Sequence, residues 1–481
     1  MTLLEPGLNS PPGVIKHVHL MGICGTGMAA LAGMLQQSGY QVTGSDSHVY
    51  PPMSLFLQSL NIPVRNGYAA GNLVPSPDLV IVGNVITRKN SEACALAELK
   101  IPYLSLPQAL AHFFIRFRTS LVVAGTHGKT TTCSLLANAL YQANLDPSFM
   151  IGGIVRQFDS NFRLGKGKYF VTEGDEYDTA FFDKGSKFLH YRPQVAIITS
   201  LEFDHADIFA DLDAIKQAFR KFVALLPQNG LLIANLDDPH VAEIAAEALC
   251  PVQGYGLNPS HSWSLDDVTA INGASRFHVL KNGAPWASMT VNLSGRHNCL
   301  NSLAVCAALH HLGLNIPVIN QGLKNFAGVK RRQEVRGIEK GITVIDDFAH
   351  HPTAVRETLT GLKQAYPGQR LIAVFEPRTN SSRRAIFQND YAVAFDSADL
   401  ILLREPLPID GLSTEELFSS SRLADDLQQK RKLQAEAFAD TDTLLDRLGA
   451  ILRQGDVVAI LSNGGFDNIH VRLLQLIKEC L

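Results

Sequence analysis

The chain has 481 residues, a formal net charge of -3 and 46% hydrophobic residues. Its length predicts about three domains rather than one core. Its nearly balanced charge argues against nucleic acid or an anionic membrane surface as a partner, and no apolar run approaches the ~18 residues of a membrane-spanning helix. The N-terminus lacks a signal-peptide pattern and the seven cysteines lack C-x-x-C spacing, so we expect a cytoplasmic protein with reduced thiols.

The first predicted unit, residues 1–117, opens with a strand and a glycine turn. The strand His17–Met21 runs into GICGTGM at 22–28 and then a helix rich in small residues. Such a turn can place a diphosphate at a helix N-terminus. Because the spacing is not G-x-G-x-x-G, a nucleotide diphosphate other than NAD is favoured, and an NAD(P)-dependent oxidoreductase is the weaker alternative.

Two later strand ends of this unit carry polar groups. The strand Tyr40–Gly44 ends in Ser45 and Asp46, where a carboxylate commonly accepts hydrogen bonds from ribose hydroxyls. Asn84 follows the strand Asp78–Gly83 and is either a ligand contact or an ordinary turn residue. The candidate ligand-binding residues of the unit are Gly22, Gly25, Thr26, Gly27, Met28, Ser45, Asp46 and Asn84.

The central predicted unit, residues 118–329, contains LVVAGTHGKTTT at 121–132. Its first four residues form a predicted buried strand, 125–128 a tight turn, and Lys129 the start of a helix. In this geometry backbone N–H groups cradle phosphates, Lys129 reaches a terminal phosphate and the Thr130 hydroxyl can bind Mg²⁺. The spacing departs from G-x-x-x-x-G-K-[ST], and an ordinary strand-to-helix turn is the alternative, but the strand and helix context favours a nucleoside triphosphate site.

Two more strands of the central unit end in polar groups. The strand Lys168–Thr172 precedes an acidic segment, 173–178, whose carboxylates would repel one another unless cations share the site. Glu173 is therefore a candidate magnesium ligand beside the phosphate turn. The strand Val195–Ser200 precedes EFDH at 202–205, in which His205 taken alone would more often be structural. Convergence of these strand ends predicts one active-site edge.

The end of the central unit offers a possible base-binding face. Residues 276–293 alternate in the β manner around Asn282-Gly283, which predicts a hairpin. The helix that follows places His297 and Asn301 on one face. This pair either borders a nucleotide base or simply caps the helix.

The third predicted unit, residues 330–481, again places polar loops after strands. The strands Ile342–Ile345, Leu371–Phe375 and Val457–Leu461 are followed by Asp346, by EPRTN at 376–380 and by Ser462-Asn463. Arg332 lies in a basic cluster that is either a solvated face or a clamp for a phosphoryl group. Arginines such as Arg378 suit a substrate with carboxylates.

Together these motifs resemble the ATP-dependent Mur ligases of bacterial cell-wall synthesis, over nearly the whole chain. The segments that carry the resemblance are GTHGKTTT at 125–132, the acidic segment from 173, EFDH at 202–205, GRHNCLN at 295–301 and DDFAHHP at 346–352. GICGTGM resembles the branch that acts on UDP-N-acetylmuramate. The stretches 174–193 and 376–380 resemble the ligases of that branch that add the tripeptide L-alanyl-γ-D-glutamyl-meso-diaminopimelate.

The resemblance implies an α/β fold with three domains. These are a Rossmann-like N-terminal domain that binds the UDP-sugar, a central P-loop ATPase domain with a small antiparallel sheet, and a Rossmann-like C-terminal domain that binds the peptide. It implies ATP and Mg²⁺ as cofactors, and a reaction through an acyl phosphate. A ligase that adds L-alanine alone and a non-catalytic nucleotide-binding switch are the alternatives. We also expect a monomer or a weak homodimer.

The resemblance also implies roles for individual residues. ATP is expected at Gly125, Thr126, His127, Gly128, Lys129, Thr130, Thr131, His297, Asn301, Arg332 and Asp346, and magnesium at Thr130, Glu173 and His205. Lys129, His205 and Arg332 are the expected catalytic residues, UDP-N-acetylmuramate is expected at the first unit's candidates, and the peptide at Arg378, Asn380, Ser462 and Asn463. Several family members carry a carbamylated lysine on the helix after His205, where this chain has Phe219 or Arg220, so we expect none here.

Overall fold

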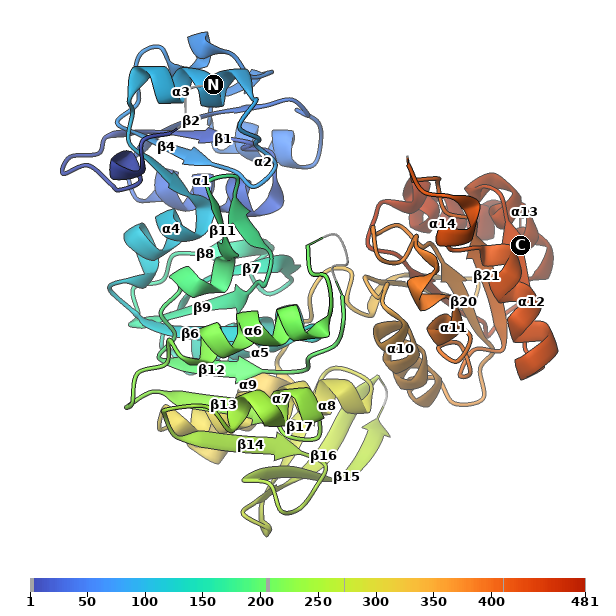
Figure 1. Cartoon of the computed structure of the whole chain (residues 1–481). Helices are drawn as coiled ribbons and strands as arrows, with labels where there is room; N and C mark the ends of the chain where they lie inside the picture. Colours follow the sequence, from blue (N-terminus) through green and yellow to red (C-terminus); the bar gives the residue numbers. More distant parts are fainter. Residues whose placement is uncertain (1–3, 205–207, 272, 410, 481) are drawn as a thin grey trace. The chain divides into compact units, whose positions relative to one another are not determined.

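The computed structural model describes residues 4–204, 208–271, 273–409 and 411–480 (Figure 1). The chain divides into two compact units. The first comprises Met1–Ile154, Phe158–Leu201 and Asp213–Gly254, and the second comprises Val155–Gln157, Glu202–Leu212 and Tyr255–Leu481. In the part of the chain that the structure describes, no helix is both long and apolar enough to cross a membrane. The three domain boundaries expected from the sequence stay a prediction.

A five-stranded parallel sheet forms the N-terminal part of the first unit, with the order β3-β2-β1-β4-β5. β1 (His17–Met21) pairs with β2 (Gln41–Asp46) and with β4 (Leu79–Val82). α1 (Thr26–Gln37) and α3 (Ser91–Leu99) lie on opposite sides of the sheet (Figure 1). The strand order reverses at β1 and β4, and ligands of open α/β sheets bind in the crevice at such a point.

A second sheet in this unit is built around β6 (Thr119–Ala124). Its order within the unit is β13-β12-β6-β9-β7-β8. β6 lies between β12 (Val195–Ile198) and β9 (Tyr169–Gly174), both parallel to it. α5 (Lys129–Gln142) follows β6 and begins at the lysine, as the sequence predicts, and it buries eleven consecutive residues from Thr130 to Leu140.

The other elements of the first unit complete these two sheets, cover them, or, in β10 and β11, form a separate antiparallel pair. They are α2 (Met53–Ser59), β3 (Val64–Asn66), β5 (Tyr103–Ser105), α4 (Leu106–Leu110), β7 (Ser148–Val155), β8 (Ser160–Arg163), β10 (Asp178–Ala180), β11 (Asp183–Ser186), α6 (Leu212–Val223), β13 (Leu231–Asn235) and α7 (Pro239–Ala245).

The second unit begins with an antiparallel meander. β14 (Val252–Gly256) pairs in parallel with β15 (Trp263–Ile271), which continues into β16 (Ala274–Lys281) and β17 (Ala284–Val291) as antiparallel strands. The predicted hairpin turn at Asn282-Gly283 is confirmed, since both residues have positive φ, 51° and 75°, as a two-residue type I′ turn requires. Helices α8 (Arg296–His311) and α9 (Ile316–Lys324) pack against this meander.

A six-stranded sheet follows, with the order β18-β19-β23-β20-β21-β22. Only the edge strand β18 is antiparallel to its neighbour among the pairings described. The strands are β18 (Glu334–Glu339), β19 (Ile342–Asp347), β20 (Leu371–Phe375), β21 (Leu400–Arg404), β22 (Gln434–Phe438) and β23 (Val457–Leu461), and the helices are α10 (Pro352–Ala365), α11 (Gln388–Tyr391), α12 (Ser420–Arg431), α13 (Thr441–Ile451) and α14 (Ile469–Cys480).

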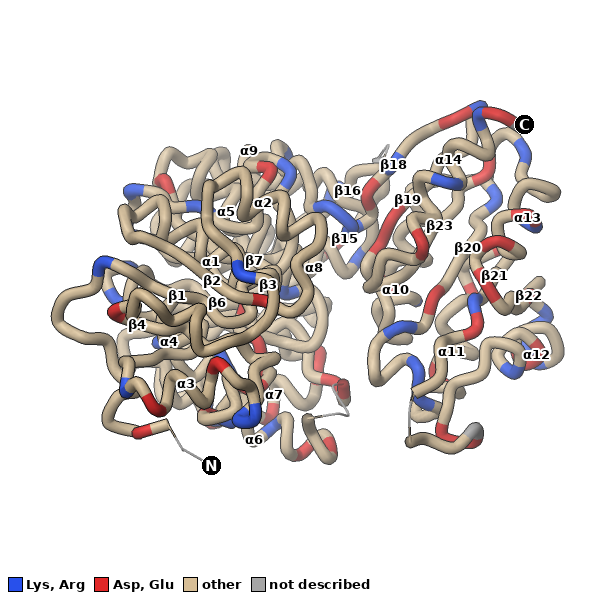
Figure 2. Tube along the Cα trace, turned by 90° about the horizontal axis from the view of Figure 1, so that it is seen from above, with Lys and Arg blue, Asp and Glu red and all other residues tan. Residues whose placement is uncertain are grey.

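Apolar side chains cover both faces of this six-stranded sheet. One core joins the sheet to α10, α11 and α12, and includes Phe375 and Tyr391. The other joins it to α13 and α14, and includes Val374 and Ile469. Because helices cover both faces of the sheet, a ligand can reach it only at the ends of the strands, as in doubly wound α/β sheets. Along the described chain, basic and acidic residues are interspersed in both units (Figure 2).

Candidate active site

The turn formed by residues 125–128, called the phosphate turn below, lies at the carboxyl end of β6, between this strand and α5. Gly125 has a φ of 131° and Gly128 a φ of 81°. A Cβ on Gly125 would lie 2.2 Å from Thr199 Oγ1, so this position requires glycine. His127 N donates to Ser200 Oγ at 3.1 Å. The turn is therefore tied to the segment after β12 and opens at the N-terminus of α5, which is a favourable place for an anion.

Lys129 supplies the positive charge of this turn. Its Nζ donates to the Gly125 carbonyl at 2.5 Å and to the two Glu176 carboxylate oxygens at 3.1 and 3.2 Å. Burial disfavours the charged ammonium, but the carboxylates of Glu176, Asp175 and Glu173 outweigh burial and hold the pKa of Lys129 above its usual value. Lys129 therefore stays charged at neutral pH, as a phosphate-binding lysine must.

Two of the three predicted magnesium ligands lie next to the phosphate turn in the fold. Glu173 belongs to β9 and is the register partner of Val123 on β6, and Thr130 is the second residue of α5. A carboxylate and a hydroxyl are the hard oxygen donors that Mg²⁺ prefers, so these residues fit the ion. Glu173 Oε1 also accepts a hydrogen bond from Gly152 N at 2.6 Å. The third predicted ligand, His205, lies outside the described residues.

The helix that was expected to lack a carbamylated lysine is α6. Phe219 on this helix is 1% exposed, and Arg220 Nε pairs with Glu247 at 2.8 Å. Lys216 lies one turn earlier and pairs with Glu243 at 2.8 Å. The ammonium of Lys216 is thus held in a network of ion pairs between α6 and α7.

The first glycine turn is organised by the end of β2. Gly22 N donates to the Ser45 carbonyl at 2.8 Å, and Cys24 N donates to Asp46 Oδ2 at 2.9 Å. The Ser45 side chain is fully buried and its Oγ donates to Glu92 Oε1 at 2.8 Å. Ser45 and Asp46 therefore shape the turn through the Ser45 carbonyl and the Asp46 carboxylate, and the Ser45 hydroxyl points into the core.

The remaining residues of this predicted site surround the start of α1. Gly25 is the N-cap of α1, and Thr26, Gly27 and Met28 form its first turn. Met28 is only 5% exposed, so its backbone rather than its side chain is the part that can face a ligand. Asn84 Nδ2 donates to the Asp178 carbonyl at 3.0 Å. The Asn84 loop is thereby joined to the acidic segment that follows β9.

In the second unit, His297 and Asn301 lie on one face of α8, one turn apart. His297 Nδ1 is 3.9 Å from Glu357 Oε2. Burial holds the pKa of His297 below its usual value, although the carboxylates of Glu357 and Asp347 act in the opposite direction. A neutral imidazole beside an amide side chain offers the donors and acceptors that a nucleotide base needs.

Asp346 lies within β19 and is 2% exposed. Its Oδ1 is 3.4 Å from Arg331 Nε and 3.2 Å from His470 Nε2. Burial favours the neutral carboxyl, but His470 and Arg331 outweigh burial and hold the pKa of Asp346 below its usual value. Asp346 is therefore a buried carboxylate that lies beside Arg331 and His470 inside this unit.

The neighbouring arginine, Arg332, is the residue predicted to clamp a phosphoryl group. Its guanidinium lies 4.8 Å from the centre of the Phe348 ring. Its positive charge opposes the effect of burial on Asp347, whose pKa is nevertheless raised. The Arg331 guanidinium also lies over the Phe348 ring, 5.3 Å from its centre, so the two consecutive arginines share this ring and differ in the carboxylate that each one affects, Asp346 for Arg331 and Asp347 for Arg332.

The predicted peptide-binding loops follow β20 and β23, which are neighbouring parallel strands. Ser462 Oγ donates to Glu376 Oε2 at 2.6 Å, and Arg404 Nη1 donates to Glu376 Oε1 at 2.7 Å. Arg378 is 53% exposed, and a Cβ on Gly464 would lie 2.1 Å from its Cδ. Arg378 therefore lies across a glycine of the adjacent loop with its guanidinium accessible.

The other two predicted peptide-binding residues differ in exposure. Asn380 is exposed, whereas the Asn463 side-chain oxygen is buried and has no hydrogen-bond partner among the described residues. A buried amide oxygen that lacks a partner is available to a polar group of a ligand. Sequence reasoning missed the Glu376–Arg404 pair, because Arg404 follows the apolar run of β21 without any motif around it and Glu376 lies 28 residues earlier in the chain.

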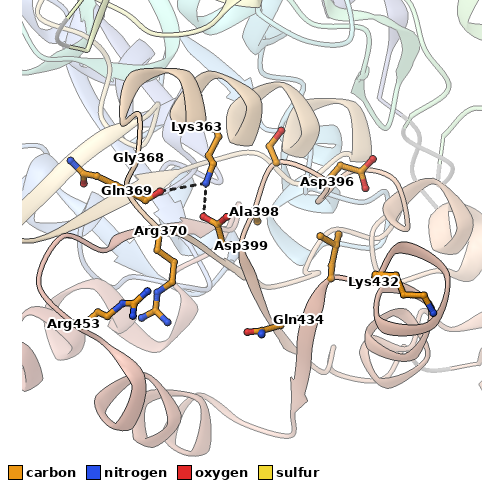
Figure 3. A pocket seen from close by; sticks show the side chains of 12 residues that line it. Lys363, Gly368, Gln369, Arg370, Asp396, Ala398, Asp399, Lys432, Gln434 and Arg453 are labelled. Carbon is orange, nitrogen blue, oxygen red and sulfur yellow. Dashed lines mark hydrogen bonds and ion pairs between the residues drawn. The ribbon is translucent and has the colours of Figure 1, made fainter.

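An open hollow of about 980 Å³ lies at the opposite edge of this sheet (Figure 3). Its lining residues precede β20, β21 and β22, and the basic groups among them include Lys363, which pairs with Asp399 at 2.5 Å, and Arg370, which pairs with Asp456 at 2.5 Å. Because ligands of parallel sheets bind at the carboxyl ends of the strands, the hollow is separate from the predicted site. None of the predicted site residues lines it.

Comparisons with known proteins cover nearly the whole chain. Family models match residues 17–118 (Mur ligase family, catalytic domain), 123–309 (Mur ligase middle domain) and 331–464 (Mur ligase, glutamate ligase domain). The UDP-N-acetylmuramate–L-alanyl-γ-D-glutamyl-meso-2,6-diaminoheptanedioate ligase of Haemophilus influenzae is 40% identical over 96% of this chain and 100% of its own length.

Two further relatives bear on the choice between branches. The crystal structure of a murein peptide ligase from Psychrobacter arcticus superposes with a TM-score of 0.71 at 35% identity, covering 97% of this chain and 99% of that one. The UDP-N-acetylmuramate–L-alanine ligase of Clostridium kluyveri is 34% identical over 96% of this chain and 98% of its own length. With all three family regions matched in order and relatives similar over their full length, the chain belongs to the Mur ligase family.

Proposed function

We propose that this protein is an ATP-dependent, ADP-forming ligase that joins UDP-N-acetylmuramate to L-alanyl-γ-D-glutamyl-meso-diaminopimelate in peptidoglycan recycling. The observation that carries the proposal is the full-length similarity to ligases of that name, which exceeds the similarity to the L-alanine ligase described above. The phosphate turn with Lys129 supports the ATP dependence. The nucleotide substrates fit a cytoplasmic enzyme, and we propose a monomer or a weak homodimer.

The proposed reaction has two steps. A lactyl carboxylate oxygen of UDP-N-acetylmuramate attacks the γ-phosphorus of ATP, which gives an acyl phosphate and ADP. The free amine of the peptide then attacks the acyl carbon, and the amide forms as inorganic phosphate leaves and the amine loses a proton. Lys129 and the N-terminus of α5 stabilise the charge on the transferred phosphoryl group. Catalysis by positioning and electrostatics requires no protein nucleophile.

The remaining roles follow the predicted residues. Thr130 and Glu173, with His205, would hold Mg²⁺, which neutralises phosphate charge when bound. His297, Asn301, Arg332 and Asp346 would contact the nucleotide. The loop at 22–28, with Ser45, Asp46 and Asn84, would bind the UDP moiety, and Arg378, Asn380, Ser462 and Asn463 the peptide. In domain terms, residues 1–117 would bind the UDP-sugar, 118–329 ATP and 330–481 the peptide.

The test is phosphate release by the purified protein with ATP and Mg²⁺. We expect release only when UDP-N-acetylmuramate and the tripeptide are both present, together with a product whose mass is the sum of the two minus water. L-alanine offered at equal concentration is expected to give a much lower rate. Faster turnover with L-alanine would instead identify an L-alanine ligase, and ATP hydrolysis without either substrate would favour a nucleotide-binding switch.

A further inference from the structure

The ammonium of Lys129 is fully engaged with protein oxygens. A lysine ammonium has three N–H donors. Its Nζ lies 2.5 Å from the Gly125 carbonyl, 3.1 and 3.2 Å from the two Glu176 oxygens, and 3.5 Å from the Thr126 carbonyl. A phosphate oxygen that binds Lys129 must therefore replace one of these partners.

Glu176 is the partner that can yield. The carbonyls of Gly125 and Thr126 belong to a turn that is held by backbone geometry and by Ser200, as described above. Glu176 instead lies in the three-residue loop between β9 and β10, and a carboxylate on a rotatable side chain can turn away without moving the sheet. Its side chain is 3% exposed, against 15% for Lys129, so this ion pair is shielded from solvent.

The pairing of Glu176 with Lys129 is specific within its acidic segment. Asp175 pairs with Lys187 at 2.6 Å, and Asp178 pairs with Lys184 at 2.6 Å. The carboxylates on either side of Glu176 are thus each paired with a lysine, one in β11 and one directly after it. Glu176 is the member of the segment that reaches the phosphate turn, 47 residues earlier in the chain.

We propose that Glu176 is a positioning residue that holds the Lys129 ammonium and competes with the terminal phosphate of the nucleotide for it. The inference rests on the proposed function in one respect, namely that the turn binds ATP. A carboxylate at this position lowers the affinity of the turn for any phosphate anion, because the anion must displace it and then lie near a buried negative charge. Weaker binding of this kind also lets the product ADP leave faster.

The direct test is the dissociation constant of ADP, measured by calorimetry with and without Mg²⁺. Glu176→Gln keeps the shape of the side chain and removes its charge. We expect about five- to tenfold tighter binding of ADP in both conditions. Asp178→Asn is the matched control, because it removes one charge from the same segment but from a carboxylate that pairs with Lys184. It is expected to stay within about twofold of the wild type.

A second measurement separates this role from a purely structural one. Glu176→Gln leaves a buried ammonium with a weaker partner, so the melting temperature without nucleotide should fall. Saturating MgADP should then raise the melting temperature of the variant more than that of the wild type, because a phosphate replaces the lost partner. An equal drop with and without MgADP, together with unchanged ADP affinity, would overturn the proposal.

Other outcomes are equally decisive. Weaker MgADP binding with unchanged binding of ADP alone would make Glu176 a metal ligand and overturn the proposal. Should Glu176→Gln fail to fold, Glu176→Asp shortens the reach to Lys129 while keeping the charge, and unchanged ADP affinity in that variant would count against the inference. A wild-type protein that does not bind ADP would instead refute the proposed function, which keeps the two failures distinguishable.

Discussion

The two glycine turns of the first unit occupy the same place between a strand and a helix, but they carry different charges. Each follows an inner strand of a parallel sheet and leads into a helix, α1 or α5. Each turn contains glycines, but their conformations differ at the helix N-cap, where Gly25 of the first turn has a φ of -66° and Gly128 of the second has a φ of 81°. Each turn is also fastened to the segment at the end of a neighbouring strand, through Ser45 in the first turn and Ser200 in the second.

The difference lies in the side chains. The first turn, GICGTGM, contains no lysine or arginine, and the carboxylate of Asp46 accepts a hydrogen bond from its backbone. The second turn ends at Lys129, whose charge is balanced by Glu176. A turn that offers only N–H groups suits a diphosphate that is bound and never broken. A turn that adds a cation suits a phosphate that is transferred.

Removal of the cation is the strongest test of this comparison. Lys129→Ala is expected to lower ligase activity by at least about 10²-fold, because the developing charge on the phosphoryl group loses its partner. The dissociation constant of UDP-N-acetylmuramate, measured by calorimetry, should change by less than about twofold. If UDP-substrate affinity fell as much as the rate, the first turn would not bind the UDP-substrate independently of the second turn.

The glycines themselves provide a matched pair of variants. Gly125→Ala would place a Cβ 2.2 Å from Thr199 Oγ1 at a φ of 131°, so we expect a loss of about 1–3 kcal/mol in the free energy of unfolding. At Gly25 a Cβ would meet its nearest neighbour, the Gly22 carbonyl, at 3.5 Å, so Gly25→Ala should cost less than about 0.5 kcal/mol.

Chemical denaturation measures both unfolding free energies, and substrate kinetics show what each turn binds. Gly25→Ala should raise the KM for UDP-N-acetylmuramate while it leaves stability nearly unchanged, because a methyl group at a helix N-cap keeps a diphosphate away from the backbone. Equal destabilisation by the two substitutions would mean that the two turns are packed equally tightly, which would contradict the difference expected here.

The smallest effect is expected at the peptide loops. Arg378 offers an accessible guanidinium, as Lys129 offers an ammonium, but for binding a carboxylate rather than for transferring a group. Arg378→Ala should raise the peptide KM about tenfold with little change in kcat, since one charge-assisted hydrogen bond is lost. Steady-state kinetics at saturating ATP and UDP-N-acetylmuramate check this, and an unchanged peptide KM would exclude Arg378 from the peptide site.

Several elements could be predicted to the residue because their signals are local. β20 and β23 are short apolar runs that polar residues follow, β1 is a short strand pattern that ends at a glycine, and the predicted bounds of all three are confirmed. The start of α5 at Lys129 is confirmed for a similar reason. β9 and β19 run further than predicted and include Glu173 and Asp346, because pairing with neighbouring strands carries polar residues into the sheet.

Side-chain partners were the part that the sequence could not supply. The Ser45 hydroxyl, expected near a ligand, donates to Glu92 in the core. Of two consecutive arginines, Arg331 rather than Arg332 reaches Asp346. Each of these contacts depends either on residues that lie far apart in the chain or on the direction of a single side chain. The periodic pattern of apolar residues, from which secondary structure is predicted, contains no information on either property.

The sequence by itself determined the two glycine turns, the buried strands before them, the lysine at the start of α5 and the membership of a ligase family. These depend on backbone conformation and apolar pattern, which neighbouring residues control. Only the tertiary structure decided that Glu176 holds Lys129, that Asn84 is bound to the Asp178 carbonyl, and that Glu376 pairs with Arg404. Charged and amide side chains bind partners at the ends of the strands, because the fold brings residues from distant parts of the chain together there.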